Sequence, residues 1–305
     1  MLRRPAPASP QTKPRAWRRQ LRAAIYLLII VLLAVFLFHL GPDPWVIAAS
    51  RWPVFLALMI SIGAGLVVQA RSFQTVAPPG TCRLPMLSLV HIWAVSAVLS
   101  IVAPLFAGLA TRTALLARSG MPLGACLSTS TRQIWMGLEF ALLLAAISLP
   151  FVLFPNSYLL AAGAAVGWFT MLAVRQTTGR GVTRNPSPNA HARALLYAIG
   201  HPVPRHAYPW YVFQIVLMSL TYYLAFAGLG APLSWAEAIA LSSVTVALSL
   251  ILFVPNGLGF TDALWVVIAT RSGLSLEEAV ALAIVIRISH LAVALLLAIT
   301  TIRSK

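Results

Sequence analysis

The chain of 305 residues has few acidic residues: Asp and Glu together number six, against 22 Lys and Arg. General acid–base catalysis and metal binding rely heavily on carboxylates, so few positions could serve either. The motifs HExxH and GxSxG and the phosphate-binding P-loop are also missing. Ser234-x-x-Glu237 and Ser275-x-x-Glu278 fit capping boxes at helix starts, which gives two of the six acids a structural role. We therefore predict no catalytic residue, no metal ion and no cofactor.

Charged residues make up only 9% of the chain, whereas soluble domains carry about a quarter. Hydrophobic residues make up 60%, and the mean hydropathy is +0.87. This composition excludes a soluble domain and indicates an integral membrane protein. The net charge of +16 lies in a tail and loops beside apolar runs, with no nucleic-acid-binding motif, so it reports orientation and contact with anionic lipid. Cys82 and Cys126 lack metal-ligand spacing and leave the redox compartment open.

Eight apolar runs are long enough to span a bilayer, which takes about 20 residues each. They are Ala23–Leu40, Trp52–Ala70, Pro85–Ala103, Ile134–Phe154, Tyr158–Val174, Pro209–Leu229, Trp235–Val254 and Ala279–Ile302. The first run is longer than the apolar core of a signal peptide, so we interpret it as a retained helix. Seven basic residues precede it and predict a cytoplasmic N-terminus. The expected domains are a basic cytoplasmic tail, 1–22, and a transmembrane domain, 23–303.

The predicted topology contains a conflict. The loop of residues 175–207 carries five arginines and should be cytoplasmic, but five simple crossings from a cytoplasmic N-terminus would place it outside. Residues 104–120 form an apolar segment too short, at about 1.5 Å per residue, to cross the membrane core. This segment is either a re-entrant half-helix or part of a broken span, and only the second alternative moves the loop inside.

Two stretches of the chain share a series of landmarks in the same order. Each has Pro-x-x-x-Gly, a short apolar helix ending in Arg-Ser-Gly, and a long helix with a buried arginine. The landmarks are Pro104, Gly108, residues 118–120 and Arg132 in the first copy, and Pro255, Gly257, Gly259, residues 271–273 and Arg287 in the second. We predict two repeats, about 52–154 and 209–303, each with an interrupted segment. The alternative is two ordinary breaks between helices.

Ionisable residues inside apolar runs are the candidates for function, because burying them in a membrane is costly. Arg287 and His290 are three residues apart and share a helical face, as do Arg132 and Glu139, seven apart. The arginine fork binds phosphate through two parallel hydrogen bonds. The two faces together could hold a phosphate at membrane depth.

A helix that starts after Gly108 or Gly259 would add free N–H groups to such a site. The other interpretation is structural. Arg287 would then pair with Asp262, and Arg132 with Glu139 or with backbone carbonyls, only to permit packing. The sequence leaves both interpretations open.

Residues 255–263, Pro-Asn-Gly-Leu-Gly-Phe-Thr-Asp-Ala, resemble the Pro-Gly-Gly-Leu-Gly-x-x-Glu-Ala signature of the lysylphosphatidylglycerol synthase transmembrane family, also called flippase-like. Pro104-x-x-x-Gly108-x-x-x-Arg112 resembles the upstream Pro-x-x-x-Gly-Glu-x-x-Arg element of that family. The chain departs from the pattern at three positions. Asn256 replaces a glycine, Asp262 replaces the glutamate, and Leu109 stands where the upstream element has an acid.

The resemblance implies an all-α integral membrane protein of about eight transmembrane helices with two interrupted segments. The implied function is to move an anionic phospholipid or lipid-linked precursor across the bacterial inner membrane. The substrate-binding residues expected at the lipid phosphate are Arg132, Arg287, Arg112, Asp262, Glu139 and His290. The family's synthase domain is not expected, since the chain ends at Lys305, and lysyl transfer is therefore not expected either.

Two alternatives to transport are retained. The protein could be an intramembrane lipid-modifying transferase, although the scarcity of acids argues against it. It could also be a non-catalytic accessory subunit that assists a partner enzyme of lipid or glycan synthesis. In each case the partner is an anionic membrane lipid or an enzyme that handles one, and not nucleic acid.

Overall fold

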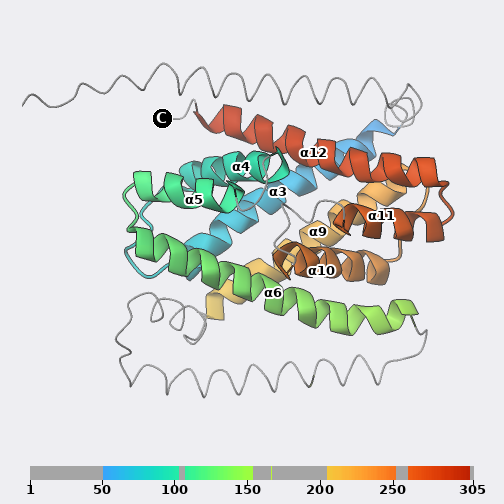
Figure 1. Ribbon diagram of the computed structural model, residues 1–305, viewed down its shortest axis with the longest axis horizontal. Helices are drawn as coiled ribbons and strands as arrows, with labels where there is room; N and C mark the ends of the chain where they lie inside the picture. Colours follow the sequence, from blue (N-terminus) through green and yellow to red (C-terminus); the bar gives the residue numbers. More distant parts are fainter. Residues whose placement is uncertain (1–50, 103–106, 154–165, 167–204, 252–259, 303–305) are drawn as a thin grey trace, which may run out of the picture. The chain divides into compact units, whose positions relative to one another are not determined.

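The computed structural model describes residues 51–102, 107–153, 166, 205–251 and 260–302, and the regular structure in these residues is helical (Figure 1). The helices are α3 (Trp52–Val76), α4 (Met86–Val102), α5 (Ala107–Arg118), α6 (Leu123–Leu153), α9 (Tyr208–Gly228), α10 (Trp235–Ile251), α11 (Phe260–Arg271) and α12 (Leu276–Ile302), with a 3₁₀ turn at Arg205–Ala207. The predicted all-α membrane bundle is confirmed.

Four of the described helices, α3, α6, α9 and α12, are long and apolar enough to cross a membrane. Helices α4 and α10 are apolar but have only 17 residues each. The described part of each helix reaches roughly 25 Å at about 1.5 Å per residue, and the residues that follow each one lie outside the described part of the chain. The predicted run Ala23–Leu40 lies outside the described residues, as does all of Tyr158–Val174 except Val166.

The predicted start of one span, at Ile134, is wrong because α6 already begins at Leu123. The first turns contain polar residues that ended the apolar run in the sequence. Thr129, Ser130 and Gln133 are nevertheless buried, and Gln133 Nε2 donates to Gln69 O and Ser72 Oγ of α3. Polar side chains that bond to a neighbouring helix are compatible with a buried helix in a membrane.

Helices α4 and α5 form an antiparallel hairpin. Ser96 Oγ of α4 donates to Gly108 O at the start of α5, at 2.8 Å, and Arg112 lies over the ring of Trp93, one turn earlier in α4. Positions farther back in α4 thus meet positions farther along α5. Helices α4 and α5 therefore lie side by side and run in opposite directions.

The close approach within this hairpin depends on a residue without a side chain. A Cβ at position 108 would overlap Ser100 Oγ and would lie 2.7 Å from Ser96 O of the backbone. Real Cβ atoms do not come that near a carbonyl oxygen. Gly108 was predicted as a helix break, and the structure places it inside the first turn of α5, where it permits contact with α4.

The Arg-Ser-Gly tripeptides end the two 12-residue helices, α5 and α11, in the same way. Gly120 and Gly273 have φ values of 92° and 96°, which glycine adopts without strain. The following N–H groups, of Met121 and Leu274, donate back into the last helical turn at 3.2 and 3.1 Å. This is the Schellman arrangement, and it explains why the two tripeptides are alike.

The predicted capping boxes are present at the starts of α10 and α12. Ser234 N and Oγ both donate to Glu237 Oε2 at 2.7 Å, and Glu237 N donates to Ser234 Oγ at 3.3 Å. Ser275 and Glu278 repeat the pattern at 2.8, 2.9 and 3.2 Å. These two carboxylates therefore accept hydrogen bonds from backbone N–H groups at the helix starts.

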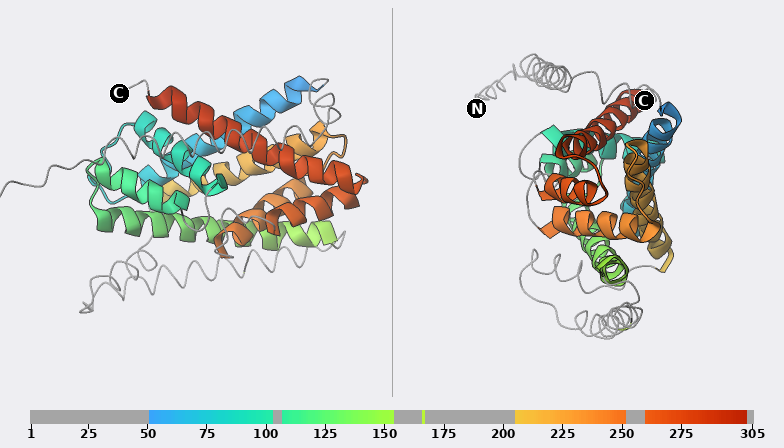
Figure 2. Two further views of the ribbon diagram at one scale, coloured as in Figure 1. Left: turned by 45° about the horizontal axis from the view of Figure 1, so that its top comes forward. Right: turned by 90° about the vertical axis from the view of Figure 1, so that its right-hand side faces the viewer.

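The helices of the two halves follow the same order of lengths: long, 17 residues, 12 residues, long. Helix α3 packs against α9, α4 against α12, and α10 against α6 (Figures 1 and 2). The long first helices of the two halves, α3 and α9, thus pack on each other, and the 17-residue helix of each half packs on the last helix of the other half. A core of Phe73, Leu89, Trp93, Leu116 and Cys126 fills the space between α3, the first hairpin and α6.

Candidate functional site

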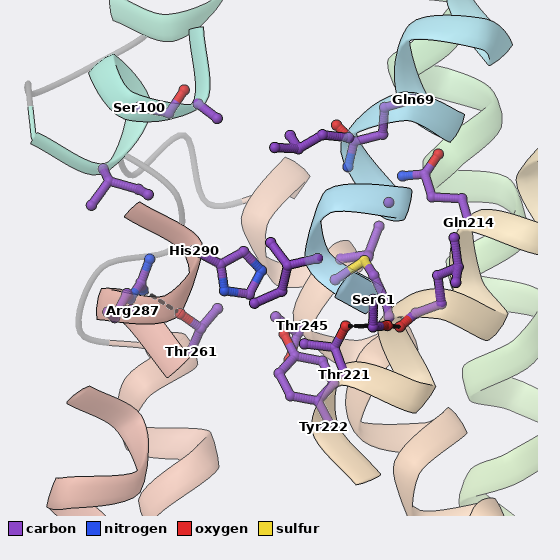
Figure 3. Close-up of a pocket in the computed structure, with 18 of the residues that line it drawn as sticks. Ser61, Gln69, Ser100, Gln214, Thr221, Tyr222, Thr245, Thr261, Arg287 and His290 are labelled. Carbon is purple, nitrogen blue, oxygen red and sulfur yellow. Dashed lines mark hydrogen bonds between the residues drawn. The ribbon is translucent and has the colours of Figure 1, made fainter. Parts of the chain in front are cut away.

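A cavity of about 250 Å³ lies among α3, α4, α5, α9, α10, α11 and α12 (Figure 3). Its walls combine apolar and polar side chains from both halves of the sequence. The polar lining residues of the first half are Ser61, Gln69, Ser100 and Arg112, and those of the second half are Gln214, Thr221, Tyr222, Thr245, Thr261, Arg287 and His290. A polar cavity inside apolar helices is the expected place for a hydrophilic ligand.

Arg287, in the middle of α12, is held by the start of α11. Its Nε donates to Asp262 Oδ1 at 2.9 Å, and its Nη2 donates to Asp262 Oδ2 at 3.2 Å and to Thr261 Oγ1 at 2.9 Å. The guanidinium also lies 5.2 Å from the centre of the Trp265 ring. The predicted pairing of Arg287 with Asp262 is confirmed, and the same arginine lines the cavity.

Arg112, on α5, lines the same cavity. Unlike Arg287, it has no carboxylate partner among the described residues. Its guanidinium lies 4.5 Å from the centre of the Trp93 ring, and its Nε is buried with no hydrogen-bond partner. Among the residues that the structure describes, none forms a hydrogen bond or ion pair with it. An arginine carries five N–H donors, and leaving them unmet away from water is costly. Arg112 therefore has hydrogen-bond donors that the described residues leave available.

His290 points from α12 into the cavity (Figure 3). Its Nδ1 lies 2.9 Å from Ile286 O, one turn earlier. A carbonyl oxygen only accepts, so Nδ1 carries the proton and, in the neutral ring, Nε2 is an acceptor. His290 can thus accept a hydrogen bond from a ligand that lies beside Arg287.

Polar contacts join α3 and α9 along one wall of the cavity. Ser61 Oγ donates to Leu217 O at 2.9 Å and lies 3.0 Å from Thr221 Oγ1. The side-chain amides of Gln69 and Gln214 form no hydrogen bond with the described part of the chain. Figure 3 shows both side chains among the residues that line the cavity.

The structure brings together four of the six predicted site residues. Arg112, Arg287 and His290 line the cavity, and Asp262 lies against Arg287. Of the predicted helix breaks, Gly108 lies in α5, and the others, Pro104, Pro255, Gly257 and Gly259, lie outside the described residues.

Arg132 and Glu139 do not line this cavity, contrary to the expectation that both buried arginines serve one site. Arg132 follows its glycine by 12 residues (132 − 120) and Arg287 follows its glycine by 14 (287 − 273). Two extra residues turn a helix by about 200°, so the two arginines point to different faces. Glu139 instead accepts a hydrogen bond from Trp135 Nε1 at 2.6 Å, one turn earlier in α6.

Several lining residues were not predicted from the sequence. Trp93 and Trp265 looked like ordinary apolar positions, yet each supports a cavity arginine. Gln69 and Gln214 could have been found, because each is a lone amide within an apolar run. Within the described residues, no group of three or more His, Cys, Asp or Glu could hold a metal ion.

Comparison with protein families matches residues 18–298 to the family described as "Lysylphosphatidylglycerol synthase TM region". The match covers both halves of the helical bundle and the cavity between them. Comparisons with curated proteins and with solved structures found no match.

Proposed function

The chain belongs to the lysylphosphatidylglycerol synthase TM region family of multi-pass membrane proteins, and we propose that it binds the phosphate of an anionic lipid in this cavity and moves the headgroup across the membrane. The observation that carries the proposal is Arg112, a half-buried cation that lines the cavity and has no anionic partner among the described residues. Phosphate oxygens match the fork of arginine donors and would neutralise its charge.

The balance of charge supports an anionic ligand. Arg112 and Arg287 place two positive charges at the cavity, and Asp262 compensates one of them. A phosphodiester with a single negative charge would restore neutrality. Asp262 and the phosphate would then compete for Arg287, so the headgroup could bind while the ion pair loosens and leave when it reforms.

The hairpin of α4 and α5, and the corresponding helices α10 and α11 of the second half, fit a transport role. We propose six crossing helices, with α4–α5 and α10–α11 as hairpins that enter from opposite sides, in place of eight crossings. With a cytoplasmic N-terminus, this count puts the basic loop 175–207 in the cytoplasm, as its five arginines require. In this arrangement the two repeats, 52–154 and 209–303, would enclose a cavity that either side of the membrane can reach.

This topology predicts the side on which Cys82 is modified. Cys82 lies in the loop between α3 and α4, which the count places in the cytoplasm, and burial raises the pKa of its thiol. Because the thiolate is the reactive form, a membrane-impermeant maleimide should react slowly at neutral pH and faster near pH 9. We expect labelling of inverted membrane vesicles and none of intact cells. Labelling of intact cells would reverse the proposed orientation, and buried Cys126 is the internal control.

The proposed function is tested by the lipids that the purified protein retains. Native mass spectrometry would compare the wild type with Arg112→Gln and with Arg118→Gln, a control at the exposed end of the same helix. Charge-assisted hydrogen bonds contribute about 1.5–3 kcal/mol, so Arg112→Gln should lower retention of one anionic lipid about 10- to 100-fold. The Arg118 control should retain it. An unselective lipid profile that neither variant changes would instead favour an accessory subunit.

A further inference from the structure

We propose that the cavity selects headgroups that carry hydroxyl groups and no amino group, such as a polyol phosphodiester, and excludes aminoacylated headgroups. The inference rests on the proposed function, because it takes the phosphate to be bound at Arg112. It concerns what lies beyond the phosphate and follows from the remaining groups of the cavity.

The described lining of the cavity includes no carboxylate that could receive an ammonium group. None of its described lining residues is Asp or Glu. Five of the six acids of the chain are described, and each lies elsewhere or is engaged: Glu139 with Trp135, Glu237 and Glu278 in capping boxes, Asp262 with Arg287, and Glu277 exposed at the start of α12. While Asp262 stays paired with Arg287, a headgroup amine would therefore enter a site with two cations whose one nearby carboxylate is already engaged.

Aromatic rings do not offer a second way to bind an amine. A cation can bind over the face of an indole ring, but Trp93 and Trp265 each already hold an arginine, at 4.5 and 5.2 Å. Tyr222 packs against Trp265, with ring centres 5.6 Å apart. An ammonium group at either indole would meet a guanidinium of the same charge, which opposes binding.

Hydroxyl groups of a headgroup, in contrast, can form hydrogen bonds with residues of the cavity. The amides of Gln69 and Gln214 each offer donors and an acceptor, and neither is used within the described part of the chain. They come from α3 and α9, and both line the cavity (Figure 3). Each amide can donate to and accept from a hydroxyl group. A glycerol or sugar headgroup carries several hydroxyl groups.

The size of the cavity agrees with a small headgroup. Its volume of about 250 Å³ is below the roughly 300–1,000 Å³ of sites that enclose a whole drug-sized ligand. A phosphate with a small polyol fits this space, while the acyl chains stay in the lipid. A headgroup lengthened by an aminoacyl group needs more room.

Calorimetric titration of the purified protein with short-chain lipids tests the inference. The probes are phosphatidylglycerol, lysyl-phosphatidylglycerol, phosphatidylethanolamine and phosphatidic acid, with water-soluble glycerol phosphate as the lipid-free comparison. We expect phosphatidylglycerol to bind at least about tenfold more tightly than either amino lipid. Gln214→Leu should reduce its advantage over phosphatidic acid, whereas Arg112→Gln should weaken all phospholipids together.

A gain of binding separates selectivity from misfolding. Gln214→Glu adds a carboxylate to the cavity and should raise the affinity for lysyl-phosphatidylglycerol while lowering that for phosphatidylglycerol, a reversal that an unfolded protein cannot produce. Equal binding of the two lipids by the wild type would overturn the inference and leave the proposed function intact, provided that Arg112→Gln still weakens both. Phospholipid binding that does not depend on Arg112 would overturn both. Glycerol phosphate binding as tightly as the lipid would show a soluble ligand and overturn the lipid assignment.

Discussion

Replacing Gly108 with alanine should destabilise the protein by about 3 kcal/mol, the upper end of the usual cost of overpacking. A Cβ at this position would overlap Ser100 Oγ and lie 2.7 Å from Ser96 O, so α4 and α5 would have to separate. Helix propensity alone predicts that this substitution stabilises the protein, since alanine is favoured over glycine by about 1 kcal/mol within a helix. Thermal unfolding in detergent, followed by size-exclusion chromatography, would measure the change.

Gly124→Ala is the matched control, because a Cβ there meets no atom within 4 Å and the residue is also helical. It should be neutral or slightly stabilising. The variant Gly108→Ala with Ser100→Ala should recover only part of the loss, since the Ser96 carbonyl remains. Full stability of Gly108→Ala would show that the hairpin is not packed as described. A loss of lipid binding should accompany the loss of stability, because α4 and α5 carry Trp93 and Arg112.

Removing the carboxylate of Asp262 should have two large effects of opposite sign. Breaking a buried ion pair costs about 3–5 kcal/mol, and the cost here should be smaller because Arg287 and Asp262 are 16% and 27% exposed. Asp262→Asn should therefore lower the unfolding temperature. The same change frees Arg287 from its competitor, so phosphate-bearing lipid should bind more tightly and leave more slowly.

A double-mutant cycle separates the two effects. Asp262→Asn, Arg287→Gln and the double variant would each be measured for thermal stability and for affinity toward short-chain phosphatidylglycerol. The double variant should be more stable than the sum of the two single changes predicts, since neither charge is then left alone. If Asp262→Asn binds the lipid no better than the wild type, Arg287 is a structural group, and Arg112 alone holds the phosphate.

Membrane insertion, the helix ends and the arginine candidates could be predicted from local signals. Apolar runs near 20 residues require helices in lipid, because no other structure satisfies each backbone group within its own segment. The boxes at Ser234 and Ser275 and the glycines at 120 and 273 act within one turn, so their effect is visible in a few residues. An arginine in such a run, as at position 287, marks a site whatever surrounds it.

The sequence alone therefore sufficed for what depends on a few neighbouring residues: a helical membrane protein, its helix caps, and Arg287 as a buried charge near Asp262. Tertiary structure decided what depends on packing between distant helices. It alone showed that α5 folds back along α4, that Arg132 is not among the described lining residues of the cavity, and that Trp93 and Gln69 join Arg112 and Gln214 around one space. The physical reason is that a helix sends successive residues to different faces. The face that meets a given neighbour is set by contacts between segments over a hundred residues apart, as between Ser61 and Leu217. Such contacts cannot be predicted from a local sequence pattern.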